Sequence, residues 1–379
     1  MNTMNTDKLD RFLDEMPQRG IPGCDLAVTV DGKEVYRRFS GFSDAAMKRP
    51  VSRDDLYWIF SASKVITCVA AMRLVEEGSL KLNDKVSDYL PAFASLTVKQ
   101  KDGSVIPATE PMRVIHLFTM TGGMGYDISA PAIREACEQP GANTVSICSA
   151  MAKVPLFFEP GTRYRYSLCH DVLAAVVEVV SGMRFSDYLQ QNIFDPLGMA
   201  RTGFRPTEEQ LTHFAQSYEY NNADGSVRQI PIGNTYALMP AYDSGGAGLF
   251  TSVDDYMKVI STLACGGTTP DGYCLLAPAT IAEMEVNRLC PAAWKDFVAG
   301  RLYGYGWGLC GRVHVNPTRS LSRSSVGEFG WDGAQGAFCM VDRKNRTALY
   351  FAMQVASCGY AYNVLHPTLR NLVFEMLGK

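Results

Sequence analysis

A serine and a lysine three residues apart, Ser61 and Lys64, stand at the start of a strongly apolar stretch. If the stretch is a helix, positions i and i+3 are neighbours on its surface, so the hydroxyl and the amine lie side by side. A serine hydroxyl becomes a strong nucleophile when an adjacent base takes its proton. A lysine amine can be that base where burial or nearby positive charge favours its neutral form. The pair therefore indicates nucleophilic catalysis.

The same spacing also fits a serine that caps a helix beside a lysine in solvent. The residues that follow Lys64 argue against this interpretation, because they leave almost no polar face. They are Val65, Ile66, Cys68, Val69, Ala70, Ala71 and Met72. A helix that is apolar all round is buried, and a buried ammonium group is costly without partners. We therefore expect a buried helix from Ser61 to about Gly78, with a functional lysine at its entrance.

The N-terminal region predicts a helix followed by a hairpin. Residues 7–19 place apolar side chains on one helical stripe. Residues 24–30 and 34–39 are short runs typical of strands, and Asp31-Gly32 between them is a strong type I′ turn signal.

Residues 80–290 carry helical patterns that proline and glycine interrupt, and they are clearest at 172–180 and 253–263. Strand patterns return late in the chain. They cover residues 327–330, 337–341 and 348–354, with a charged turn at 342–346 and a last amphipathic helix at 363–377.

This order predicts a mixed α/β (α+β) fold in which both chain ends build one antiparallel sheet. The terminal helices are expected on one face and the Ser61 helix on the other. We predict a single catalytic domain over residues 7–377. Its α/β lobe comprises residues 1–78 and 295–379, and an inserted, mostly helical lobe comprises residues 79–294.

Composition excludes several classes of function. A net charge of −3 gives no electrostatic reason to expect nucleic acid or an anionic membrane as partner. The chain has 11 cysteines at wide spacings without a C-x-x-C pair, which argues against a disulfide scaffold or a zinc site. The histidines show no ligand spacing, so we expect neither metal nor cofactor. Without a secretory signal pattern or an 18-residue apolar run, the protein is expected to be soluble and cytoplasmic.

Three further segments accompany the Ser-Lys pair. They are FEPGTRYRYSLCHD at 158–171, SGGAGLFTSVDDY at 244–256 and GWDGAQG at 330–336. With them the chain resembles the serine β-lactamase and penicillin-binding-protein superfamily, and within it the class C-like family VIII carboxylesterases. The resemblance runs almost end to end, through LFTMTGGMGY at 117–126, IFDPLGM at 193–199 and YGWGL at 305–309. It implies a β-lactamase/transpeptidase-like fold.

The resemblance also implies roles for individual residues. Ser61 is implied as nucleophile, and Lys64 with Tyr166 as a coupled acid/base pair. The backbone N–H groups of Ser61 and Ala334 are implied as an oxyanion hole, which stabilises a tetrahedral intermediate. A tyrosine between two cations would also be expected to ionise far below its ordinary pKa.

Trp331, Asp332 and Gly333 occupy the place of the superfamily's Lys-Thr-Gly motif. Leu168 stands where penicillin-directed members carry asparagine, and Trp331 stands where they carry lysine. The missing polar groups are those expected to hold an amide and a carboxylate, so an apolar pocket wall favours neutral esters. Tyr126 is a further candidate for the cleft wall. Asp171, one turn beyond Tyr166, is expected to brace this segment.

The leading hypothesis is hydrolysis of short- to medium-chain carboxylic esters through an acyl-Ser61 intermediate, with a small-molecule ester as substrate. Transfer of the acyl group to a small-molecule alcohol remains an alternative, as does weak β-lactam or D-amino-acid amide hydrolysis. A non-catalytic relative that has kept the fold is more distant. An α/β-hydrolase is disfavoured because Gly41-Phe-Ser43-Asp-Ala45 lacks the second glycine of the nucleophile elbow.

Overall fold

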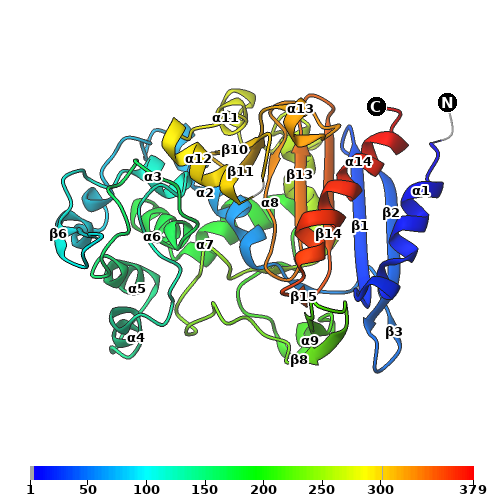
Figure 1. Cartoon of the computed structure of the whole chain (residues 1–379), viewed down its shortest axis with the longest axis horizontal. Helices are drawn as coiled ribbons and strands as arrows, with labels where there is room; N and C mark the ends of the chain where they lie inside the picture. The colour runs from blue at the N-terminus through cyan, green and yellow to red at the C-terminus, as the bar shows by residue number, and fades with distance from the viewer. Residues whose placement is uncertain (1–3, 301) are drawn as a thin grey trace.

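The computed structural model describes residues 4–300 and 302–379. Its main feature is an eight-stranded sheet with the order β10-β11-β12-β13-β14-β1-β2-β3, in which every pairing is antiparallel (Figure 1). The strands are β1 (Gly23–Val30), β2 (Lys33–Asp44), β3 (Arg49–Pro50), β10 (Tyr305–Gly308), β11 (Gly311–His314), β12 (Phe329–Gly330), β13 (Phe338–Asp342) and β14 (Thr347–Ala352). Both ends of the chain contribute to this sheet, as predicted.

The N-terminal hairpin confirms the turn prediction. Asp31 and Gly32 have φ values of 50° and 76°. Positive φ at both central residues is the signature of a type I′ turn, which matches the twist of the flanking strands. On its other edge β1 pairs with β14, from Asp25 opposite Ala352 to Val30 opposite Thr347.

Terminal helices cover one face of the sheet, as predicted. Helices α1 (Asp7–Asp14) and α14 (His366–Met376) contact each other there and lie side by side in Figure 1. They share one hydrophobic core with the side chains that point to this face from β1, β13 and β14. That core includes Leu9, Leu13, Leu26, Val28, Met340, Phe351, Leu369 and Val373.

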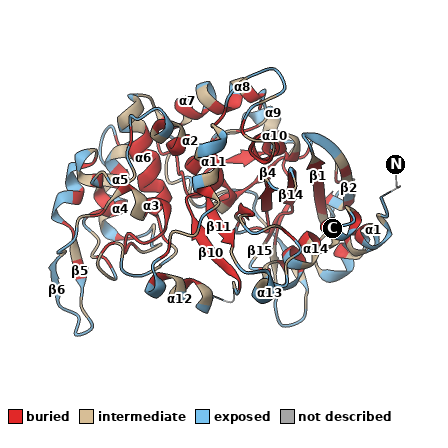
Figure 2. Ribbon diagram, turned by 90° about the horizontal axis from the view of Figure 1, so that it is seen from above, coloured by how far each residue is buried: buried red, intermediate tan, exposed pale blue. Residues whose placement is uncertain are grey.

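The opposite face differs from the prediction. Helix α10 (Val253–Ala264) packs directly on β1, β13 and β14, and Tyr256 stacks on Tyr350 with 4.1 Å between the ring centroids. The Ser61 helix, α2 (Ser63–Glu76), packs mainly against α6 (Cys169–Ser181). Because α2 is apolar all round, it suits a position between helices better than one on a sheet. Figure 2 shows α2 and α6 as almost wholly buried elements.

The middle of the chain is more varied than predicted. It contains α3 (Val114–Phe118), α4 (Pro131–Cys137) and α5 (Thr144–Met151), and also small sheets that the sequence did not indicate. One pairs β7 (Ser217–Tyr220) with β8 (Val227–Ile230) and β15 (Val355–Ala356), one pairs β4 (Tyr57–Trp58) with β9 (Phe250–Thr251), and one pairs β5 (Thr97–Lys99) with β6 (Val105–Pro107). Within the described residues, no helix has the length and apolarity needed to cross a membrane.

Candidate active site

Ser61 lies in a tight turn immediately before α2. The turn is a 3₁₀ segment, Phe60–Ala62, and Phe60 has a φ of 46°, a conformation that is unfavourable for a bulky residue. The Tyr256 hydroxyl from α10 donates a hydrogen bond of 2.8 Å to the Ala62 carbonyl. The backbone of Leu249 donates one of 3.1 Å to the Ser63 hydroxyl. The turn is thus held from two sides, which fixes the Ser61 side chain at the mouth of the helix.

The Lys64 side chain is almost completely buried, with 1% exposed. Its Nζ lies 2.6 Å from the Gly246 carbonyl, 3.1 Å from the Ser61 Oγ and 3.2 Å from the Tyr126 hydroxyl. It also lies 4.7 Å from the centroid of the Tyr166 ring. The amine therefore contacts both the candidate nucleophile, Ser61, and the ring of its candidate acid/base partner, Tyr166.

A buried carboxylate is linked to Lys64 through the loop before β9. Asp171 on α6 accepts a 2.6 Å hydrogen bond from the Ser244 hydroxyl, whose oxygen accepts one of 3.1 Å from the Ala247 N–H. The carbonyl of the same peptide, that of Gly246, faces Lys64. Since hydrogen bonds in a chain polarise one another, the negative charge of Asp171 strengthens the acceptor that holds the Lys64 amine.

Tyr166 lies between Lys64 and an indole. The Trp331 Nε1 donates a 2.9 Å hydrogen bond to the Tyr166 hydroxyl, and the Tyr166 ring stacks on Tyr126 with 5.4 Å between centroids. Burial raises the pKa of Tyr166 well above its ordinary value. The expectation of an easily ionised tyrosine is therefore wrong. Trp331 stands in the place of a lysine, so that position brings no positive charge to the phenol, and desolvation dominates.

Two backbone N–H groups near Ser61 have no acceptor among the described residues, those of Ser61 and Ala334. The segment that carries Ala334 approaches the Ser61 turn very closely: a Cβ at Gly333 would lie 2.3 Å from the carbonyl oxygen of Ile59. Only glycine fits there. The Gly333 N–H bonds to the Ala337 carbonyl at 2.7 Å, and its carbonyl accepts a 2.8 Å bond from Tyr362.

A cavity of about 640 Å³, the Ser61 cavity, opens in front of these groups. It is lined near the serine by Ser61, Tyr166, Trp331, Asp332, Gly333 and Ala334. The Asp332 carboxylate is engaged by the buried Arg312 guanidinium at 2.8 Å. Tyr126 lies behind Tyr166 and touches Lys64.

Leu168 does not line the Ser61 cavity, contrary to the sequence prediction. Its side chain is 3% exposed and packs in the main core, because the residue lies directly before α6 and turns inward. The apolar wall of the cavity near Ser61 therefore comes from Trp331.

Sequence reasoning missed several residues that complete the site. Gly246 supplies the carbonyl on Lys64, Trp307 packs on Trp331 at 4.5 Å between centroids, and Arg312 pairs with Asp332. The glycine-rich run at 244–248 was a usable signal: a Cβ at Gly246 would lie 2.3 Å from Asp171 Oδ2. Trp307 and Arg312 lie on β10 and β11, short strands with no clear alternation.

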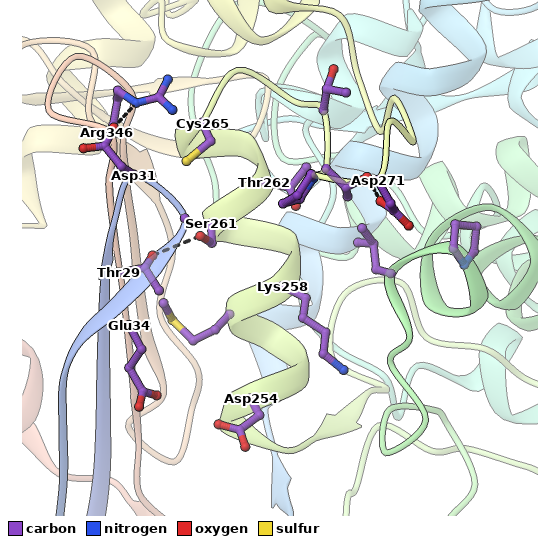
Figure 3. A pocket seen from close by; sticks show the side chains of 17 residues that line it. Thr29, Asp31, Glu34, Asp254, Lys258, Ser261, Thr262, Cys265, Asp271 and Arg346 are labelled. Carbon is purple, nitrogen blue, oxygen red and sulfur yellow. Dashed lines mark hydrogen bonds and ion pairs between the residues drawn. The ribbon is translucent and has the colours of Figure 1, made fainter.

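A second cavity of similar size, about 600 Å³, lies between the β1–β2 hairpin and α10 (Figure 3). We call it the hairpin groove. Its walls include Thr29, Asp31, Asp254, Lys258, Ser261 and Arg346. In the part of the chain described, no group of three or more histidine, cysteine, aspartate or glutamate residues is arranged to hold a metal ion.

Comparisons with known proteins agree with this architecture. The Beta-lactamase family model matches residues 9–357. The chain is 30% identical to Esterase EstB of Burkholderia gladioli over 363 residues, covering 89% of this chain and 87% of the relative. It is 29% identical to Acyltransferase calJ of Penicillium decumbens, over 88% and 84% of the two chains.

Among solved structures, EstCE1, a hydrolase with promiscuous acyltransferase activity, superposes with a TM-score of 0.81 at 25% identity. The match covers 97% of this chain and 98% of EstCE1. The family model spans far more than half of the sequence, and the structural match covers nearly all of both chains. The chain therefore belongs to the beta-lactamase family, in a part of it that includes esterases and acyltransferases.

Proposed function

We propose that this protein is a serine hydrolase that cleaves carboxylic esters through an acyl-Ser61 intermediate. The observation that carries the proposal is the buried Lys64 amine, 3.1 Å from the Ser61 hydroxyl and enclosed by Tyr126, Tyr166 and the Gly246 carbonyl. A nucleophile and a base within hydrogen-bond reach, with the base oriented by a third group, are the parts that covalent catalysis needs. The esterase among the relatives supports the same reaction.

Acylation begins when the Ser61 Oγ attacks the ester carbonyl carbon and its proton moves to Lys64. The oxygen of the tetrahedral intermediate receives hydrogen bonds from the N–H groups of Ser61 and Ala334, which have no other acceptor among the described residues. One such donor is worth about 3–4 kcal/mol of transition-state stabilisation. The intermediate then collapses, and the bond between the carbonyl carbon and the alcohol oxygen breaks.

Tyr166 supplies the proton that the departing alcohol needs. Because burial raises the pKa of Tyr166, its phenol is protonated at neutral pH and can donate. The Trp331 N–H stabilises the oxygen as its proton leaves, and Lys64 restores the proton. Water then attacks the acyl-Ser61 carbonyl by the reverse sequence, which releases the acid and the free hydroxyl.

Substrate class follows from the wall of the Ser61 cavity. Trp331 presents an indole where penicillin-directed relatives carry an ammonium group, and the Asp332 carboxylate is engaged by Arg312. A neutral acyl or alcohol group beside Trp331 leaves no polar group unpaired, which favours small esters over β-lactams or D-amino-acid amides.

The test is intact-mass spectrometry after brief exposure to p-nitrophenyl butyrate. We expect an acyl group on Ser61, located by peptide mapping, and loss of most turnover in Ser61→Ala. Ester turnover in Ser61→Ala equal to that of the native protein contradicts the proposal. Nitrocefin turnover that matched the ester turnover would contradict the substrate assignment but not the role of Ser61.

Acyl transfer to a small alcohol is the second candidate. It is favoured by the acyltransferase relative and by the structural neighbour with promiscuous acyltransferase activity. Product analysis with added primary alcohols separates the two reactions: a transferase gives mainly the new ester at millimolar alcohol, whereas a hydrolase gives mainly the acid.

A further inference from the structure

A second serine, Ser320, lines the Ser61 cavity beside an imidazole. It lies far from Ser61 and Lys64 in the sequence. Ser320 ends the short helix α13 (Pro317–Ser320), is half-buried and contributes to the cavity wall. Its Oγ lies 2.7 Å from the Nε2 of His314. A longer contact of 3.4 Å to the Pro317 carbonyl competes poorly with this bond. The reaction proposed for Ser61 does not use either residue.

The second nitrogen of His314 is held so that Nε2 faces Ser320 as an acceptor. His314 is completely buried on β11, and its Nδ1 lies 3.0 Å from the Ser325 carbonyl and 3.2 Å from the Ser324 hydroxyl. The Ser324 proton is directed to the buried Glu328 carboxylate at 3.1 Å. The Ser325 carbonyl can only accept, which assigns the hydrogen to Nδ1 and leaves the lone pair on Nε2.

The surroundings of Ser320 also favour its deprotonated form during attack. The backbone N–H of Ser322 donates to the Ser320 Oγ at 3.1 Å. Gly304 makes room for the serine: a Cβ there would lie 2.7 Å from the Ser320 Cβ. The preceding residue, Arg319, lines the same cavity.

We propose that Ser320 is a second activated serine, with His314 as its general base, which reacts with esters and with organophosphorus electrophiles in the Ser61 cavity. Nucleophile, base and base-orienting acceptors are arranged here as covalent catalysis requires. The Ser320 Oγ bonds to the carbonyl carbon while its proton passes to His314 Nε2. When the carbon–oxygen bond to the alcohol breaks, that proton passes to the alcohol, leaving acyl-Ser320. The proposal does not depend on the role of Ser61.

The experiment uses Ser61→Ala, which removes the serine of the first site. The probe is an alkyl fluorophosphonate, whose phosphorus–fluorine bond breaks as the Oγ–phosphorus bond forms. We expect one phosphonate per chain, located on the peptide with Ser320 and absent from Ser61→Ala/Ser320→Ala. His314→Gln in the Ser61→Ala background should slow labelling at least about 100-fold, the lower range of general-base catalysis.

Since His314 is buried, folding of each variant is checked by thermal melting. If His314→Gln does not fold, Ser324→Ala takes its place: it removes one acceptor at Nδ1 and should slow labelling severalfold. Ser226→Ala is the matched control, because Ser226 is exposed and donates to Asp224 away from the cavity; its labelling should equal that of the parent. A folded Ser61→Ala protein that stays unlabelled, or is labelled elsewhere, overturns the proposal.

Discussion

The Ser61 cavity and the hairpin groove are nearly equal in volume, about 640 and 600 Å³, yet their walls differ in chemistry. In the hairpin groove several charged groups are neutralised in pairs, with Asp31 on Arg346, Asp254 on Arg37 at 2.6 Å and Lys258 on Asp255 at 2.9 Å. The Asp271 carboxylate accepts a hydrogen bond from the Thr269 hydroxyl. Figure 3 shows Asp31 beside Arg346, and Asp254 and Lys258 along α10.

The Ser61 cavity instead has polar groups that remain available to form hydrogen bonds with a ligand. Two backbone N–H groups have no acceptor among the described residues, and a buried amine touches a hydroxyl. An empty volume is therefore a weak indication of a site. Polar groups that are desolvated and left available for a ligand are a stronger one, because the fold tolerates their cost only where something else compensates for it.

Among the substitutions in the two cavities, Lys64→Met should have the largest effect on ester turnover. Without the amine, Ser61 loses its base, and ester turnover should fall about 10³-fold, within the range of general-base catalysis. Replacing a buried amine by an apolar chain of similar length should leave the melting temperature unchanged or raise it. Kinetics with p-nitrophenyl butyrate and thermal melting check both. Turnover within tenfold of the native protein contradicts the proposed base.

Asp171→Asn keeps the shape of the side chain but removes its charge from the chain of hydrogen bonds that ends at Lys64. A hydrogen bond to a charged group contributes about 1.5–3 kcal/mol, so kcat should fall roughly 10- to 100-fold. KM should change little, because Asp171 does not line the cavity. Ser252→Ala, which removes a helix cap on α10, is the control for a purely structural loss. A raised KM with native kcat would argue against the linkage.

The buried histidine His170 predicts that the free energy of unfolding depends on pH. Burial lowers the pKa of His170 to about 3. Between pH 6.5 and 3 the unfolded chain binds a proton there that the folded chain does not, so stability falls as the pH falls through this window. His170→Gln should reduce the slope by about 1.4 kcal/mol per pH unit, measured by urea unfolding from pH 4 to 7. An unchanged slope would mean that His170 is protonated in the fold.

The smallest effect is expected in the hairpin groove. Asp31→Asn removes an exposed ion pair with Arg346, and such pairs contribute roughly 0–1 kcal/mol. Asparagine also tolerates the positive φ of this turn position. Ester turnover should stay within twofold and the melting temperature within a few degrees. A tenfold loss of turnover would show that the groove communicates with Ser61.

Local chemistry allowed the hairpin, the buried helix and the terminal helices to be predicted. The conformation of the Asp31-Gly32 turn and the burial of the helix after Lys64 are both indicated by a few consecutive residues. Strands β10 and β11 were missed because glycine interrupts both and their burial leaves no alternation of polar and apolar residues. The position of α10 on the sheet was missed for a different reason, since it depends on which apolar helix reaches that face.

For the site, residue types were predictable and mutual distances were not. The Ser61–Lys64 spacing follows from helix geometry, but the contact between Lys64 and Gly246 joins residues far apart in the chain. Leu168 illustrates the limit, because a resemblance gives a position in the chain while the turn into α6 decides where the side chain points. The ionisation of Tyr166 was mispredicted for the same kind of reason, since desolvation depends on the whole fold.

The pairing of β1 with β14 has a consequence for biosynthesis. Residues 25–30 emerge from the ribosome more than 300 positions before their partners at 347–352. The central sheet thus cannot close until residues 347–352 have been made, and contacts so distant in sequence form slowly. Because Ala334 is also made long after Ser61 and Lys64, a nascent chain that already displays this pair still lacks one of the two proposed oxyanion donors. Appearance of ester turnover during translation would therefore time the final docking of the C-terminal segment.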